Sequence, residues 1–273
     1  MTTKHVKFDG SIPEIYDTHL GPLLFHHYAA DLAGRIHVAA GGRVLETACG
    51  TGIATEKLRD VLADDIEIIA TDLNDAILAI AADRRGNLAN VTYRQADALS
   101  LPFEDNSFDA VACQFRIMFY PDKDAGAREA LRVLKPGGGT FALNVWGSFE
   151  VNPAMRIAHE TISGFFESDP PTFLETPFGY YHIEPIETLL RDAGFDAIDI
   201  ETVDTVVERP SAHLVAVGAV EGNPGIHEVD ERASADREVV VEAVAQALRD
   251  NFGDAPIRAP MQAIVATAHK PKG

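Results

Sequence analysis

The sequence predicts a doubly wound α/β fold, in which a mostly parallel, seven-stranded sheet carries helices on both faces. Short apolar runs alternate with stretches of helical periodicity, and only a few residues connect one to the next. Because repeated strand–helix units with short connections return each strand in the same direction, they form a parallel sheet. The predicted strands cover residues 43–48, 66–71, 91–95, 108–113, 139–145, 195–207 and 262–268, and the early helices cover 53–62, 74–85 and 122–134.

The ends of the chain predict two additions to this core. Residues 1–22 contain helix breakers and are expected to be irregular, and a helix with one apolar stripe should follow them. We expect residues 1–40 to form an N-terminal helical lid and residues 41–150 to form the core. Residues 151–273 should complete the sheet, with a helical insertion near 208–258. This insertion is interpreted as a cap, and surface decoration or a homodimer contact are the alternatives.

The junction between the first strand and the first core helix is the candidate ligand site. The apolar run breaks at Gly50 and Gly52, and helix-forming residues follow directly. Glycine lets the backbone turn without a Cβ clash, and a helix N-terminus presents unpaired N–H groups and a positive dipole end. The second strand ends at Asp72, 20 residues beyond Gly52. A doubly wound fold places a carboxylate there to bind ribose hydroxyl groups.

Two residues of this junction discriminate between nucleotide ligands. A dinucleotide fingerprint carries a third glycine at the position where this chain has Thr55. Glu46, at the end of the first strand, would repel a pyrophosphate. An acid at that place suits a ligand that has an ammonium group and no phosphate, as S-adenosylmethionine does.

Four segments carry a resemblance to a known family. They are residues 46–52 (ETACGTG), 71–74 (TDLN), 95–103 (QADALSLPF) and 131–138 (LRVLKPGG). On these motifs the chain resembles the class I S-adenosylmethionine-dependent methyltransferases, in the branch of the ubiquinone and menaquinone biosynthesis methyltransferases (methyltransferase type 11). The resemblance covers about residues 40–146 and implies a Rossmann-like core. The family often has glycine where this chain has Ala48.

The strand ends and the resemblance together predict how the cofactor is held. Asp72 is expected to accept from the ribose hydroxyls, and Leu73 to pack against the adenine. Asp97 is expected to accept from the adenine amino group, with the Ala98 backbone at the ring edge. The methionine end should meet the backbone of the glycine junction and of the fourth strand's end. The full predicted set is Tyr16, Glu46, Ala48, Gly50, Gly52, Asp72, Leu73, Asp97, Ala98 and Gln114.

The predicted reaction moves a methyl group to an oxygen, carbon or nitrogen atom of a small, apolar or aromatic acceptor and leaves S-adenosylhomocysteine. Such an in-line displacement needs a nucleophile held about 3 Å from the methyl carbon and a site without water. Histidine is the usual base near neutral pH, and His182, beside Tyr181 in an aromatic patch, is the candidate. Tyr16 is expected to contact the methionine carboxylate or the acceptor. For both residues a packing role is the alternative.

The amino-acid composition limits the ligands, metals and surroundings that the protein is expected to have. The formal net charge of −19 disfavours nucleic acid, because a phosphate backbone would be repelled over most of the surface. The acidic, lysine-poor sequence fits a high-salt habitat or an ordinary acidic enzyme. The spacing of Cys49 and Cys113 suits neither a zinc site nor a disulfide framework, so no metal is predicted. No apolar run approaches the length of a membrane span, and a cytoplasmic location is expected.

Three other functions remain open at the level of sequence. The site could bind S-adenosylmethionine for non-methylating chemistry such as cyclisation. It could belong to an NAD-dependent oxidoreductase, which Glu46 and Thr55 disfavour. The same fold could also serve as a non-catalytic interaction module, since a fold does not by itself define a function.

Overall fold

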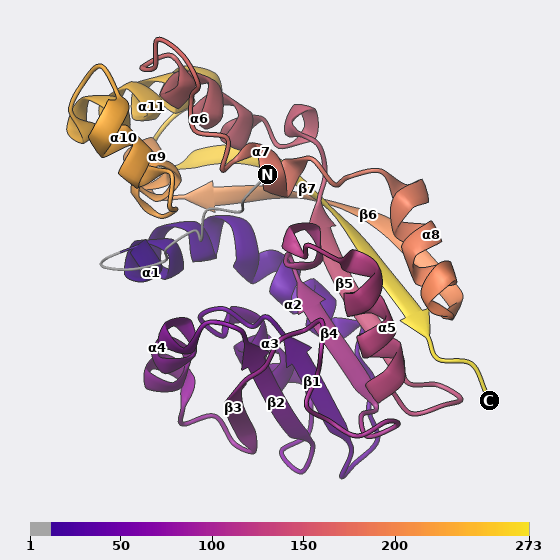
Figure 1. Cartoon of the computed structure of the whole chain (residues 1–273). Helices are drawn as coiled ribbons and strands as arrows, with labels where there is room; N and C mark the ends of the chain where they lie inside the picture. The colour runs from indigo at the N-terminus through magenta and orange to yellow at the C-terminus, as the bar shows by residue number, and fades with distance from the viewer. Residues whose placement is uncertain (1–11, 273) are drawn as a thin grey trace. The chain divides into compact units, whose positions relative to one another are not determined.

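The computed structural model describes residues 12–272, whose strands form one seven-stranded sheet in the order β3-β2-β1-β4-β5-β7-β6 (Figure 1). β1 pairs in parallel with β2 and β4, β2 with β3, and β4 with β5, while β5 pairs antiparallel with β7. The predicted doubly wound, mostly parallel sheet is therefore confirmed. The strands are β1 Arg43–Thr47, β2 Glu67–Asp72, β3 Val91–Gln95, β4 Ala110–Gln114, β5 Thr140–Trp146, β6 Asp196–Arg209 and β7 Ile257–His269.

Helical segments precede β1, lie between most of the strands as far as β5, and make up much of the chain after β5. They are α1 Ile12–Ile15, η1 Tyr16–Phe25, α2 His26–Gly34, α3 Ile53–Val61, α4 Asp75–Arg85, η2 Ile117–Phe119, α5 Lys123–Val133, η3 Phe149–Val151, α6 Pro153–Ser163, α7 Glu175–Phe178, α8 Ile183–Ala193, α9 Ala212–Glu221, α10 Ile226–Arg232 and α11 Arg237–Phe252. The core elements lie within two residues of their predicted bounds. The insertion predicted near 208–258 is helical and consists of α9, α10 and α11.

The prediction that residues 1–22 are irregular is wrong where the structure describes them. From Ile12 onward the chain is helical, and η1 contains Pro22 within π-type turns. Such wide turns accommodate a residue that lacks an N–H donor. Leu20, Leu23 and Leu24 are buried, so tertiary packing of an apolar face overrides the local breakers. Residues 1–11 lie outside the described part of the chain.

Contacts divide the described chain into two compact units. The sheet unit consists of His26–Trp146, Tyr180–Val203 and the residues from Ala263 onward. The helical unit consists of the described residues up to Phe25, together with Gly147–Gly179 and Asp204–Gln262. β6 and β7 contribute residues to both units. The domain boundaries predicted at residues 40 and 150 stay predictions.

The order of the strands indicates which edge of the sheet unit a ligand would use. From β1 the chain moves outward to β2 and β3, and it then returns to β4 on the other side of β1 (Figure 1). Right-handed crossovers in opposite directions place α3 and α5 on opposite faces of the sheet. Leu32, Leu58 and Ile68 join α2, α3 and β2 in one buried cluster. The strand order reverses between β1 and β4, and doubly wound sheets bind ligands beyond the carboxyl ends of the strands at that point.

Candidate functional site: the carboxyl edge of the sheet

The loop between β1 and α3, which we call the glycine loop (Ala48–Gly52), turns through three left-handed residues. Ala48, Gly50 and Gly52 have φ values of 53°, 57° and 87°. The Cys49 N–H donates to the Thr71 carbonyl at 2.8 Å, which ties the loop to the end of β2. A side chain is strained at positive φ, so glycine would adopt the conformation of Ala48 at a lower cost.

The two glycines of the loop have different surroundings. A Cβ on Gly52 would lie 3.1 Å from Arg85 Cδ and 3.3 Å from the Tyr93 hydroxyl, so Gly52 is needed for packing against α4 and β3. A Cβ on Gly50 would meet only Arg116 Nη2, at 3.5 Å. The Gly50 side of the loop therefore faces away from packed protein, which leaves its backbone open to close approach by a ligand.

Glu46 lies beneath the glycine loop and is only 1% exposed. Its carboxyl accepts a hydrogen bond of 2.5 Å from the Thr55 hydroxyl of α3. Burial raises the pKa of Glu46 to about 8, and the nearby Asp72 charge adds to that rise, while Thr55 and the Arg85 charge oppose it. Glu46 thus joins the end of β1 to the start of α3. Its predicted contact with the cofactor stays a prediction.

Asp72 lies at the end of β2 with its carboxylate turned to the glycine loop. One oxygen accepts from the Gly50 N–H at 2.9 Å, and the other accepts from the Asn74 N–H at 3.0 Å. The residue is 6% exposed. Both oxygens are held in place by backbone donors, and each keeps a further lone pair. The structure therefore brings Asp72, the residue expected to bind the ribose, into direct contact with the glycine loop.

The predicted adenine contacts follow from β2 and β3. Leu73 follows the buried end of β2, and its side chain is 64% exposed. The Ala96 N–H donates to the Asp72 carbonyl, so the segment after β3 runs beside the end of β2. Asp97 is exposed, and one of its oxygens accepts from the Leu99 N–H at 2.9 Å. Ala98 is half-buried beside it.

The end of β4 completes this edge and adds a residue that the sequence did not single out. Gln114 pairs with Asn144 of β5 at the last position of β4. Phe115 follows with a positive φ of 50°. Arg116 comes next, and its guanidinium approaches Gly50 across the switch in strand order. Only the position of Arg116 after a parallel strand could have signalled it, and many arginines share that position without any role.

The two candidates for acceptor chemistry belong to different units. Tyr16 belongs to η1 in the helical unit, where its ring stacks on Phe25 at 4.9 Å between centroids. His182 is exposed immediately before α8 in the sheet unit, and its ring lies 4.2 Å from that of Tyr181. The aromatic residues near His182 in the sequence fall in both units: Phe173 and Phe178 belong to the helical unit, and Tyr180 and Tyr181 to the sheet unit. The roles of Tyr16 and His182 stay predictions.

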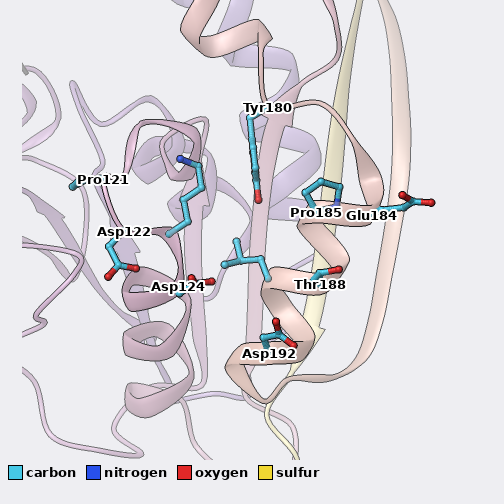
Figure 2. A pocket seen from close by; sticks show the side chains of 10 residues that line it. Pro121, Asp122, Asp124, Tyr180, Glu184, Pro185, Thr188 and Asp192 are labelled. Atoms are coloured by element: carbon cyan, nitrogen blue, oxygen red, sulfur yellow. The ribbon is translucent and has the colours of Figure 1, made fainter. Parts of the chain in front are cut away.

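A separate open cavity of about 840 Å³ lies between the start of α5 and α8 in the sheet unit (Figure 2). Its wall includes Tyr180, whose ring lies 5.2 Å from the Lys123 ammonium. Four carboxylates line it: Asp122, Asp124, Glu184 and Asp192. None of the predicted cofactor residues contributes to its wall. A wall this acidic is a poor site for a ligand that carries a carboxylate.

Two kinds of feature were sought in the described part of the chain: clusters of metal-binding side chains and helices that could span a membrane. Within residues 12–272, no group of three or more His, Cys, Asp or Glu side chains could hold a metal ion. Over the same range, no helix has the length and apolar character needed to cross a membrane.

Known proteins resemble both the sequence and the fold. A methyltransferase domain model matches residues 44–138, which contain the glycine loop, Asp72, Asp97 and Arg116. The ubiquinone/menaquinone biosynthesis C-methyltransferase of Idiomarina loihiensis is 41% identical over 197 residues, which cover 66% of this chain and 75% of that protein.

Two solved structures share the architecture. The [4+2]-cyclase SpnF superimposes with a TM-score of 0.58 at 25% identity, over 91% of this chain and 82% of its own. Phosphoethanolamine N-methyltransferase 2 of Haemonchus contortus, solved with S-adenosyl-L-methionine, has a TM-score of 0.59 at 18% identity, over 95% of this chain and 57% of its own. At that identity the second likeness concerns the fold alone.

The sequence relationship decides between the functions that composition and motifs left open. The match to curated C-methyltransferases extends well beyond the shared motifs, over most of the relative's length. An NAD-dependent oxidoreductase and a non-catalytic module are thereby set aside. The protein uses S-adenosylmethionine, and the chain belongs to the class I S-adenosylmethionine-dependent methyltransferases of the ubiquinone/menaquinone C-methyltransferase type.

Proposed function

We propose that the protein transfers the methyl group of S-adenosylmethionine to an oxygen, carbon or nitrogen atom of a small, apolar or aromatic acceptor and releases S-adenosylhomocysteine. The transfer is an in-line displacement without a covalent enzyme intermediate, so the protein acts by positioning both reactants and excluding water. The net charge of −19 argues against a nucleic-acid acceptor. A homodimer built on the helical insertion remains part of this proposal.

The observation that carries the proposal is the carboxylate of Asp72 bound to the Gly50 N–H at the switch in strand order. In the proposed complex Asp72 accepts from the two ribose hydroxyls with its remaining lone pairs. The exposed side chain of Leu73 is covered by the adenine, and Asp97 accepts from the adenine amino group. The open backbone at Gly50 receives the methionine part. The ligand thus covers an apolar surface that the protein itself leaves in water.

Isothermal titration with S-adenosylhomocysteine tests this arrangement. Asp72→Ala removes two charge-assisted hydrogen bonds to the ribose, and we expect the affinity to fall roughly 100-fold. Asp75→Ala removes an exposed carboxylate at the start of α4 and should bind as the wild type does. Unchanged affinity of a folded Asp72→Ala variant would remove the ribose assignment.

We further propose His182 as the base that takes a proton from an acceptor such as a phenol, enol or amine. Loss of a positioned base lowers turnover by about 10²- to 10⁴-fold. With an acceptor found in a panel of these compounds, His182→Ala should lose kcat by that order. His213→Ala changes an exposed histidine of the helical unit and serves as the control. Normal turnover of His182→Ala would end this assignment.

The likeness to SpnF favours one second function. SpnF is a [4+2]-cyclase on a related scaffold, and at 25% identity over most of both chains it shows that this architecture hosts cyclisation. Under this alternative the site binds the cofactor without transferring its methyl group. Release of S-adenosylhomocysteine during turnover separates the two, because only methyl transfer produces it.

A further inference from the structure

The backbone at the end of β4 is strained at one residue and held there by several contacts. Phe115 has a φ of 50°, which costs a non-glycine residue on the order of 1 kcal/mol. Its N–H donates to both the side-chain and the main-chain oxygen of Asn144, at 2.9 and 3.1 Å. Its ring stacks on Trp146 at 3.7 Å and 4° between planes. This strained residue determines the direction in which Arg116 leaves the strand.

Arg116 directs its charge at the glycine loop. Its Nη2 lies 3.5 Å from the position that a Cβ on Gly50 would occupy, on the open side of the loop. The charge also acts on the neighbouring thiol. Burial raises the pKa of Cys49 well above its usual value, and the charges of Glu46 and Asp72 raise it further, whereas the charge of Arg116 opposes the rise. The guanidinium therefore lies beside the loop, on the side that Gly50 leaves open.

The negative charges around the loop disfavour binding of the carboxylate in the methionine part of the cofactor. Asp72 and Asp97 suit the ribose and the adenine, but their negative charges would repel the methionine carboxylate. Arg85 also lies near the loop, but at its other end. It approaches Gly52, on the packed side of the loop. Arg116 approaches the open side.

We propose that Arg116 binds the α-carboxylate of the methionine part of S-adenosylmethionine and so fixes the methyl-bearing sulfur against the end of β4. A planar guanidinium matches a carboxylate with two parallel hydrogen bonds, which a backbone N–H of the loop cannot supply alone. The motifs of the family had assigned this end of the ligand to the backbone of the loop and of Gln114, or to Tyr16. This inference rests on the proposed cofactor arrangement.

The test compares two ligands that differ only in the carboxylate. S-adenosylhomocysteine carries it, and its decarboxylated analogue, S-adenosyl-3-thiopropylamine, does not. The wild type should bind the first at least tenfold more tightly. In Arg116→Met the affinity for S-adenosylhomocysteine should fall about 10- to 100-fold, while the affinity for the analogue stays within about twofold. Arg116→Lys keeps the charge but cannot form two parallel hydrogen bonds. Its affinity for S-adenosylhomocysteine should lie between those of the wild type and Arg116→Met.

The control and the contradicting outcomes are defined by the same titrations. Arg128→Met removes an exposed arginine from α5 and should match the wild type for both ligands. Equal losses for both ligands in Arg116→Met would show that Arg116 only supports the loop, and unchanged affinity for both would show no role; either result overturns the proposal. A folded wild type that binds neither ligand would instead overturn the proposed function, and this inference with it.

Discussion

Glu46 and Thr55 form a pair whose chemistry depends on burial. Sequence reasoning used the two residues separately, as evidence against a dinucleotide, and missed that one binds the other. Their spacing of nine residues spans the loop and the first turn of α3, so only the folded turn brings them together. The same limit hid Arg116, whose direction depends on the strained φ of Phe115. Motif positions were predictable, whereas side-chain pairing across a turn was not.

The buried carboxyl of Glu46 should make stability depend on pH. Its pKa is raised from 4.5 to about 8 in the folded protein, so the folded state keeps a proton that the unfolded chain releases. Stability should therefore fall as pH rises from 4.5 to 8, by up to about 1.4 kcal/mol per pH unit. Glu46→Gln cannot titrate and should flatten this part of the profile.

Urea unfolding at pH 5, 6.5 and 8 measures the effect of Glu46. The variant should gain stability relative to the wild type as pH rises. Only the wild type has a buried carboxyl that stays protonated in the folded state while the unfolded chain releases the proton. Parallel profiles for the two proteins would show that Glu46 is not the group responsible.

At the level of elements, sheet and helix periodicity predicted most of the core. Apolar runs such as residues 66–71 and 108–113 are buried on both faces of a parallel sheet, so their pattern is unambiguous. The segment around Gly21 and Pro22 misled prediction because its helix is stabilised by burial within the helical unit rather than by local propensity. Composition near a breaker does not reveal such tertiary support.

The start of α4 connects helix capping with the proposed cofactor site. The Asn74 side chain caps α4 by accepting from the Ala76 N–H at 2.9 Å, while its own N–H donates to Asp72. Asn74→Ala should cost about 1 kcal/mol of stability. It should also weaken S-adenosylhomocysteine binding severalfold, because the N–H that holds Asp72 loses its fixed position.

Asn74→Ser is the matched variant, since serine also caps helices well. Urea unfolding and titration calorimetry on both variants separate the two effects. If Asn74→Ala lost stability but bound the ligand as Asn74→Ser does, the cap would have no part in positioning Asp72.

On the scale of the whole molecule, the sequence indicates which cofactor the protein uses but not which acceptor it methylates. Residues 44–138 match a methyltransferase domain, and the predicted cofactor residues other than Tyr16 lie within them. The helical unit contains η1 and α9 to α11, outside those residues, where shared motifs no longer guide interpretation. Acceptor identity depends on pocket shape, which periodicity does not encode. The fold and the family were therefore predictable, whereas the cofactor-binding residues stay predictions and the acceptor was not predictable.

A crystal structure with S-adenosylhomocysteine is the most direct test of the proposed cofactor site. We expect both ribose hydroxyls within hydrogen-bond distance of the Asp72 carboxylate and the adenine against Leu73. The amino group of the adenine should lie beside Asp97. A ligand found instead in the acidic cavity between α5 and α8, or anywhere away from the glycine loop, would contradict it.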